Sequence, residues 1–309
     1  MGGLRSWDDD TDAPAIVDVQ RFSLHDGPGI RTTVFFKGCP LRCAWCHNPE
    51  SLRRTPEMRF HANRCSGEGR CAVACPRAAI RRDAEQRIDF EACDACGLCV
   101  EACRHDAIQL IGRRHELDAL VEELVKDRDY FRESGGGVTL SGGEPMLHAR
   151  YLHRLVPRLT AEGMHVALQT CGLFPWAHME PLLPHLGLVQ FDLKHMDPVT
   201  HARLTGVTNE AILANFGRLV ATGVRVEPRM PVIPGTNDDA ANVRATAAFL
   251  ARHGHRTLAC LPYHDLGEAK LRGLAPILVP LGRPRLDRAA LAPLAHQFGK
   301  EGIGVLLCD

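Results

Sequence analysis

Residues 38–50 read Gly38-Cys39-Pro40-Leu41-Arg42-Cys43-Ala44-Trp45-Cys46-His47-Asn48-Pro49-Glu50. Three cysteines stand here at the spacing C-x3-C-x2-C, and no fourth cysteine follows within the stretch. An iron-sulfur cluster held by cysteine alone takes four thiolates. The stretch therefore predicts a cluster with one iron open to a substrate or cofactor. The alternatives are a defective cluster and a zinc site that recruits His47 as a fourth ligand.

The residues ahead of this loop narrow the interpretation. Gly27-Pro28-Gly29-Ile30-Arg31 and the β-branched and aromatic run over residues 33–38 precede the cysteines, and the aromatic Trp45 lies within the loop. The loop alone is typical of the wider radical S-adenosylmethionine superfamily. With Gly-x-Gly-x-Arg ahead of it, the chain resembles the radical S-adenosylmethionine enzymes that activate glycyl radical enzymes.

The resemblance implies a function and a mechanism. Cys39, Cys43 and Cys46 are expected to hold a [4Fe-4S] cluster whose open iron binds S-adenosylmethionine. Reductive cleavage would give a 5′-deoxyadenosyl radical, which abstracts a glycine α-hydrogen in a partner glycyl radical enzyme. No catalytic side chain is expected beyond cluster and cofactor. The residues expected to cradle the partner's glycine loop are Gly27, Gly29 and Arg31.

Two other classes of function remain open at this point. Another radical enzyme, acting on a small molecule or on a protein cysteine or serine as the sulfatase-maturing relatives do, would carry the same loop and extra clusters. A ferredoxin-like electron carrier would use the barrel only as a scaffold. Formation of 5′-deoxyadenosine separates the carrier from the enzymes, and a glycyl radical in a partner separates the two kinds of enzyme.

Residues 61–112 form an insert that contains two similar cysteine runs. Each follows the bacterial ferredoxin pattern C-x2-C-x2-C-x3-C, except that Glu68 stands at the second ligand position of the first run. The fourth cysteine of each run ligates the other cluster, so two auxiliary clusters are predicted. The expected ligand sets are Cys75, Cys93, Cys96 and Cys99 for one cluster, and Cys65, Cys71, Cys103 and Glu68 or no fourth ligand for the other.

The state and role of these auxiliary clusters have several alternatives. The site with Glu68 could hold a three-iron cluster, a carboxylate-ligated four-iron cluster or a loosely bound one. The insert is expected to relay electrons from flavodoxin or ferredoxin, with a structural or docking role as the alternative. A zinc-binding or disulfide module is the remaining interpretation of its cysteine pattern.

Composition limits the partners. Lysine plus arginine and aspartate plus glutamate number 37 each, so no nucleic-acid or membrane partner is expected. The sequence has no signal-peptide pattern and no apolar run of spanning length, so its 13 cysteines are expected as metal ligands in the reducing cytoplasm. We expect a monomer.

Apolar periodicity predicts strands and helices in alternation from residue 113 onward, beginning with a single helix over residues 116–132. Together with the resemblance, this implies an α/β fold, an incomplete (β/α)6 radical S-adenosylmethionine barrel with an inserted bacterial-ferredoxin-like α+β domain. The expected parts are residues 1–60, with a mobile tail over 1–13 and the start of the barrel, residues 61–112 as the insert, and residues 113–309 as the rest of the barrel.

Several polar residues stand where strands are expected to end, which is where βα barrels place their active sites. By resemblance, the residues that bind S-adenosylmethionine are Trp45, Gly142, Gly143, Glu144, Asp192, Lys194, Arg229 and His264. Gln169 replaces an acid that helps relatives to hold a monovalent cation. Glutamine keeps an oxygen but loses the charge, so a cation site is not assigned. Asn237 or Asp238 is expected to cap the following helix.

Overall fold

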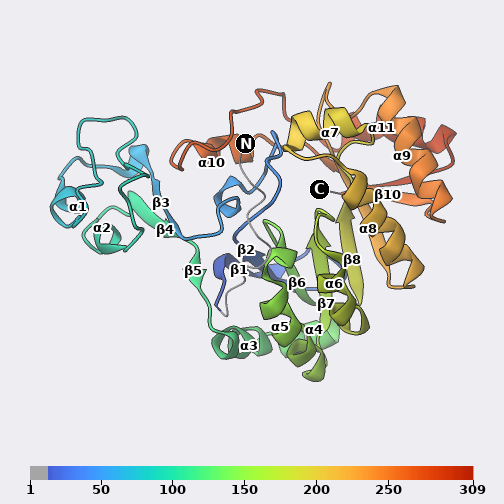
Figure 1. The fold of residues 1–309 in the computed structure, drawn as a ribbon, viewed down its shortest axis with the longest axis horizontal. Coiled ribbons are helices and arrows are strands. Elements are labelled where there is room, and N and C mark those ends of the chain that lie inside the picture. Colours follow the sequence, from blue (N-terminus) through green and yellow to red (C-terminus); the bar gives the residue numbers. More distant parts are fainter. Residues whose placement is uncertain (1–12, 309) are drawn as a thin grey trace.

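A nine-stranded sheet forms the centre of the protein (Figure 1). The computed structural model describes residues 13–308, so the tail expected over residues 1–13 lies, apart from its last residue, outside the described residues. In spatial order the strands are β11 (Gly304–Leu307), β10 (Thr257–Pro262), β9 (Val226–Val232), β8 (Leu188–Asp192), β7 (His165–Thr170), β6 (Gly137–Gly142), β2 (Arg31–Phe36), β1 (Ala15–Ser23) and β5 (Arg113–Arg114).

Most of this sheet is parallel. Neighbouring strands from β11 to β2 run parallel, whereas β1 and β5 pair antiparallel at one edge. The predicted α/β class is confirmed, with a mixed sheet. Among the described strands, β11 and β5 form the two edges and do not pair with each other, so the sheet is open.

Helices follow the strands of this sheet, and seven of the nine helices named next contribute apolar residues to the core that they share with it, whereas Pro198–Thr205 and Leu266–Leu271 do not. They are α3 (Leu117–Val125), α4 (Arg128–Ser134), α5 (Ala149–Ala161), α6 (Trp176–Met179), α7 (Pro198–Thr205), α8 (Glu210–Ala221), α9 (Ala240–Arg252), α10 (Leu266–Leu271) and α11 (Ala292–Lys300). None of the helices in the described part of the chain has the length and apolar character needed to span a membrane.

The single helix expected over residues 116–132 is wrong. The chain forms α3 and then α4, with a break at Lys126 and Asp127. Asp127 is buried, and its carboxylate accepts a hydrogen bond from Thr32 at 2.7 Å and pairs with Arg21. Those partners lie on β2 and β1. A contact with the sheet therefore decides where the first helix ends.

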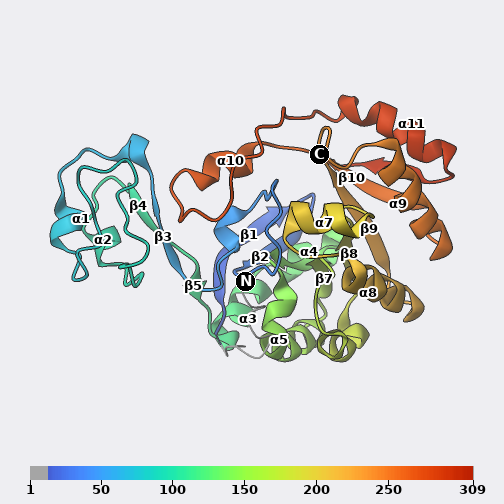
Figure 2. The same cartoon turned by 45° about the horizontal axis from the view of Figure 1, so that its top comes forward.

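A smaller unit stands beside the sheet in both views (Figures 1 and 2). We call it the auxiliary module. It consists of the antiparallel strands β3 (Glu57–Phe60) and β4 (Ile108–Ile111) and the short helices α1 (Arg70–Val73) and α2 (Leu98–Glu101). It has a core of its own, made of Met58, Phe60, Ile80, Ile88, Cys99, Ala107 and Ile108. Helix α10 lies between this module and the sheet.

Arg31 and Gly29 fasten the start of β2. Arg31 is fully buried, and its guanidinium donates to the carbonyl oxygen of Val138 at 2.6 Å and to the hydroxyl of Thr139. Gly29 has a φ of +67°, and a Cβ atom there would lie 2.4 Å from the nitrogen of Gly136. The turn therefore requires glycine. Both residues hold β2 against the start of β6.

His148 is a buried, neutral imidazole at the end of the 3-10 helix η3 (Pro145–His148). Its Nε2 donates to the carbonyl oxygen of Lys37 at 2.6 Å, and its Nδ1 has no hydrogen-bond partner. Burial lowers the pKa of His148 from 6.5 to about 4. Between pH 4 and pH 6.5, the unfolded chain binds a proton at His148 that the folded chain does not bind. The contribution of the neutral imidazole to the free energy of unfolding is therefore fully present above pH 6.5 and is lost as the pH falls toward 4.

Replacing His148 by glutamine should reduce this acid sensitivity. Between pH 7 and pH 5, the wild-type free energy of unfolding is expected to fall by about 2 kcal/mol more than that of His148→Gln, as the two pKa values require. Denaturant unfolding of both proteins without oxygen measures the difference. An equal fall in both proteins would contradict a neutral buried imidazole.

Candidate active site

A cavity of about 540 Å³ lies at the carboxyl ends of the parallel strands. The three cysteines of the loop, Cys39, Cys43 and Cys46, all line it. So do all the residues predicted to bind the cofactor except Glu144, namely Trp45, Gly142, Gly143, Asp192, Lys194, Arg229 and His264. Its volume is in the range of small-molecule sites.

The cysteine loop is held in place by the end of α7. The backbone nitrogen of Arg42 donates to the carbonyl oxygen of Thr205 at 2.7 Å, and that of Ala44 donates to Leu204 at 3.0 Å. The thiols are partly buried, and burial raises the pKa of Cys43 to about 12. Thiols in such surroundings are inert unless a metal replaces their protons. The loop therefore presents three potential ligands to one enclosed space.

The structure does not show the zinc arrangement with His47. The exposed imidazole of His47 stacks on His264, with ring centroids 6.1 Å apart. Within residues 13–308, no group of three or more His, Cys, Asp or Glu side chains is placed to hold a single metal ion. Three thiols spaced around a cavity fit a larger group, such as a cluster, that bridges them.

Arg229 supplies a cation two of whose donor atoms have no partner among residues 13–308. It lies on β9, its side chain lines the cavity, and only 4% of the residue is exposed. Its Nε and Nη1 atoms are buried and have no hydrogen-bond partner. A buried guanidinium without an acceptor is costly, and this fork of donors matches a carboxylate. The cavity is therefore suited to a ligand with a carboxylate.

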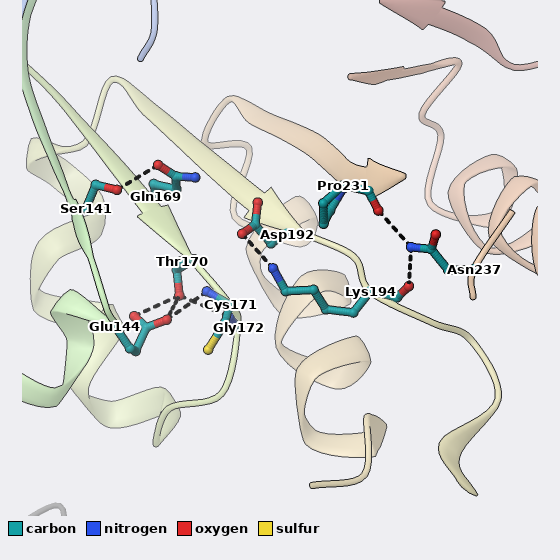
Figure 3. Close-up of polar contacts among 10 residues, drawn as sticks. All are labelled: Ser141, Glu144, Gln169, Thr170, Cys171, Gly172, Asp192, Lys194, Pro231 and Asn237. Carbon is teal, nitrogen blue, oxygen red and sulfur yellow. Dashed lines mark hydrogen bonds and ion pairs between the residues drawn. The ribbon is translucent and has the colours of Figure 1, made fainter. Parts of the chain in front are cut away.

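Asp192 and Lys194 form a second charged feature at the end of β8 (Figure 3). The Lys194 ammonium lies 2.9 Å from the Asp192 carboxylate. Burial disfavours this ammonium, but the nearby Asp192 and Cys43 outweigh burial and raise its pKa. The lysine therefore stays charged beside the cysteine loop.

Asn237 fixes the position of this lysine and was not among the predicted site residues. Its amide donates to the carbonyl oxygens of Lys194 at 3.1 Å and Pro231 at 2.7 Å (Figure 3). The expected capping role of Asn237 or Asp238 is wrong, because the Asp239 carboxylate accepts from the first amides of α9. Asn237 instead joins the ends of β8 and β9.

Glu144 lies outside the cavity wall, unlike the two glycines before it. Its fully buried carboxylate accepts hydrogen bonds from the hydroxyl of Thr170 at 2.9 Å and the amide of Cys171 at 2.7 Å (Figure 3). It also accepts one from the amide of Met146 at 3.1 Å. These bonds join the ends of β6 and β7. The structure thus gives Glu144 a positioning role, whereas the sequence predicted contact with the cofactor's amino group.

Gln169 is also engaged within the protein. Its Oε1 accepts a hydrogen bond from the Ser141 hydroxyl at 2.7 Å, and both residues line the cavity (Figure 3). The amide oxygen that could have joined a cation site therefore already has a donor. Cys171, which lines the cavity beside the Cys39 thiol, was not predicted either.

The Gly27, Gly29 and Arg31 segment does not line the cavity. Arg31 is committed to β6, as described above, so its expected role in cradling a partner's loop is not supported by its contacts. The residues just before this segment, Ser23, Leu24, His25 and Asp26, line the cavity instead. The role of Gly27, Gly29 and Arg31 in cradling a partner's loop stays a prediction.

The auxiliary module brings its cysteines together in two groups. Cys65, Cys71 and Cys103 line one small hollow together with Glu68. Burial raises the pKa of Cys99, and the charges that add to this effect come from Cys93, Cys75 and Cys96. The two groups contain the same residues as the two predicted ligand sets, whose role as ligands stays a prediction.

Lys270 holds the cysteine loop and was not among the predicted site residues. From α10, its ammonium donates to the carbonyl oxygen of His47 and to Oδ1 of Asn48, both at 3.1 Å, and to the carboxylate of Glu50 at 2.7 Å. Gly267 packs below it, where a Cβ would lie 2.1 Å from the carbonyl oxygen of Cys46. The local sequence carries no signal for these contacts, because the partners are some 220 positions apart.

Replacing Lys270 by methionine is expected to loosen the loop. In metal-free protein, alkylation of Cys46 should become roughly fivefold faster, the effect of losing about 1 kcal/mol of hydrogen bonding. Mass spectrometry of the labelled peptide measures the rate. The control is Lys300→Met, at the exposed end of α11. Equal rates in both variants would show that Lys270 does not restrain the loop.

The sequence is similar to a known family and to several characterised proteins. The model of the radical SAM superfamily matches residues 33–246. The chain is 39% identical to the (2S)-3-sulfopropanediol dehydratase activating enzyme of Klebsiella oxytoca, over 93% of this chain and 95% of that protein. It is 38% identical to the benzylsuccinate synthase activating enzyme of Thauera aromatica, over 95% and 92% of the two chains. It is 41% identical to the trans-4-hydroxy-L-proline dehydratase activating enzyme of Clostridioides difficile, over 83% and 86%.

Proposed function

Because the chain belongs to the radical SAM superfamily and, within it, to the activating enzymes of glycyl radical enzymes, we propose that its cavity holds a [4Fe-4S] cluster and S-adenosylmethionine. Cys39, Cys43 and Cys46 would hold the cluster. The observation that carries this assignment is that three thiols and the unpartnered guanidinium of Arg229 line the same cavity. One group needs sulfur ligands, and the other needs a carboxylate.

Once bound, the cluster and S-adenosylmethionine would supply the radical chemistry of the family, reductive cleavage of the cofactor and abstraction of a glycine α-hydrogen. The chain's own residues would position the cofactor and shield it from water. Arg229 would hold the methionine carboxylate through its guanidinium, and the backbone at Gly142 and Gly143 would leave room for the amino group. Lys194 keeps a positive charge beside the cluster loop.

Glu144 acts indirectly in this proposal. Its bonds to Thr170 and Cys171 fix the ends of β6 and β7, and Gly142 and Gly143 lie directly before it. Trp45 packs with Ile233 and Tyr263 in a small apolar cluster beside the loop, which keeps water from that wall of the cavity. A reactive intermediate needs such a dry, closely fitted site.

The partner is a separate glycyl radical enzyme. The relatives named above activate two dehydratases and benzylsuccinate synthase, and we propose a partner of the same radical class. Leu24 lines the cavity and is 65% exposed, so the turn over residues 23–26 marks an accessible side of the site. The partner's glycine loop would approach there.

We also propose that the auxiliary module, residues 57–111, holds two iron-sulfur clusters on the two cysteine groups. It would pass electrons from flavodoxin or ferredoxin toward the cavity. Support comes from residues 266–273, which are α10 and the two residues after it and which contact both units. The backbone amide of Phe60 in the module donates to the carbonyl oxygen of Gly273 at 2.9 Å, and Lys270 binds the cysteine loop.

Spectroscopy of the reduced cluster tests the cavity assignment. We expect the electron paramagnetic resonance signal of the loop's cluster to change shape when S-adenosylmethionine is added, because the cofactor would bind the open iron. The cleanest preparation is one in which Cys96 and Cys71 are replaced by alanine to simplify the auxiliary signals. An unchanged signal with saturating cofactor would refute binding at that iron.

A further inference from the structure

The two halves of the auxiliary module share a backbone feature at the second ligand position. Gly69 and Gly97 are both in the left-handed region, with φ of 78° and 86°, and each directly precedes a short helix, α1 or α2. Glu68 therefore occupies the backbone position that Cys96 occupies in the other half. Position 68 is a ligand position in three dimensions as well as in spacing.

The side chain of Glu68 lies where a ligand is needed. It lines the same hollow as Cys65, Cys71 and Cys103. A four-iron cluster takes four protein ligands, and three of the four are cysteines here. No other acidic residue within the described part of the chain lines this hollow. The remaining iron would thus face Glu68.

Neighbouring donors orient the Glu68 carboxylate. His105 Nε2 lies 2.9 Å from Oε1, Arg70 Nε lies 3.0 Å from Oε2, and the Ser66 hydroxyl lies 3.4 Å from Oε1. Each carboxylate oxygen has two lone pairs, so these contacts leave acceptor capacity for a metal. Ligating carboxylates commonly have such hydrogen-bonding partners, which fix their direction.

We propose that Glu68 is the fourth protein ligand of a [4Fe-4S] cluster on Cys65, Cys71 and Cys103. This inference rests on the proposed assignment of clusters to the auxiliary module. It excludes the three-iron and loosely bound alternatives for this site. One auxiliary cluster then has a unique iron with an oxygen ligand, whereas the other has sulfur alone.

Mössbauer spectroscopy of the anaerobically reconstituted full-length protein tests the ligand directly. Wild type should contain about twelve irons per chain, and one iron of the auxiliary module should show the parameters of an oxygen-ligated site. That component should fall by one iron per chain in Glu68→Cys, which leaves only the open iron of the cavity cluster without a fourth sulfur ligand, and the iron content should be unchanged. The control is Glu101→Ala, an exposed acid on α2, which should match wild type.

Glu68→Ala provides a second readout. After mild oxidation, it should show the paramagnetic signal of a three-iron cluster at about one per chain, with about eleven irons remaining. The same signal at that level in wild type would overturn the proposal, as would identical Mössbauer spectra for wild type and Glu68→Cys. Production of 5′-deoxyadenosine with a strong chemical reductant, measured on the same samples, tests the proposed function separately, because it requires only the cluster in the cavity.

Discussion

Replacing Cys43 by alanine is expected to lower the rate of 5′-deoxyadenosine formation by on the order of 100-fold or more, because two thiolates do not hold the cluster in the cavity. Cys43 lines the cavity together with Cys39 and Cys46, and none of its neighbours there is an additional free cysteine except Cys171. Cys171 already contacts the Cys39 thiol. The measurement is product formation under reducing, oxygen-free conditions.

The matched control removes a cysteine from the auxiliary module. With a strong chemical reductant, Cys96→Ala should retain measurable 5′-deoxyadenosine formation, because the reductant reaches the cavity cluster without the module. Cys96 is exposed, so its loss should cause little change in the fold. Equal losses in Cys43→Ala and Cys96→Ala would contradict the division into one catalytic and two auxiliary clusters.

Replacing Arg229 by methionine is expected to weaken binding of S-adenosylmethionine by roughly 10- to 100-fold. Methionine keeps much of the length but removes the buried donors, and hydrogen bonds to charged groups contribute about 1.5–3 kcal/mol each. The cofactor affinity of Arg229→Lys should lie between those of wild type and Arg229→Met, because lysine keeps the charge but lacks the bidentate pair of donors. Equilibrium binding to reconstituted protein measures the affinity.

Arg225→Met is the control for that series. Arg225 is exposed and directly precedes β9 at the end of the strand away from the cavity, so its loss should leave cofactor affinity unchanged. Iron content should remain equal in all four proteins. If Arg229→Met bound the cofactor as tightly as wild type does, the unpartnered guanidinium would not be the carboxylate site.

Much of the fold could be predicted from local pattern. Strand and helix periodicity placed the parallel strands and their helices, because each buried face repeats at its own spacing. The cysteine spacing placed Cys39, Cys43 and Cys46 on one loop, since that spacing is a property of a few consecutive residues. Asp192, Lys194 and Arg229 were expected from the resemblance to the family, at the predicted ends of strands.

Contacts between residues far apart in the sequence could not be predicted from local pattern. Asp127 ends α3 because Thr32 and Arg21 lie beside it in the sheet, and no pattern near residue 127 shows this. Arg31 was expected at the partner's loop, but it is buried against Val138. In both cases a charged side chain is satisfied by a strand some hundred residues away in the sequence.

The direction of the Glu144 side chain could not be predicted from its motif either. The Gly-Gly-Glu sequence correctly placed Gly142 and Gly143 on the cavity wall, because the turn follows directly from β6. The direction of the glutamate side chain depends on Thr170 and Cys171 at the end of β7. A motif fixes where its backbone lies, whereas the neighbouring strand decides which way the side chain points.

The most direct test of the whole account is formation of a glycyl radical in a partner. Reduced, reconstituted protein is mixed with S-adenosylmethionine and a candidate glycyl radical enzyme, and the partner is examined by electron paramagnetic resonance while 5′-deoxyadenosine is counted. We expect a glycyl doublet and about one 5′-deoxyadenosine for each radical, because each abstraction consumes one cofactor. A partner that stays free of radical while 5′-deoxyadenosine accumulates, across partners of every class activated by the relatives, would contradict the account.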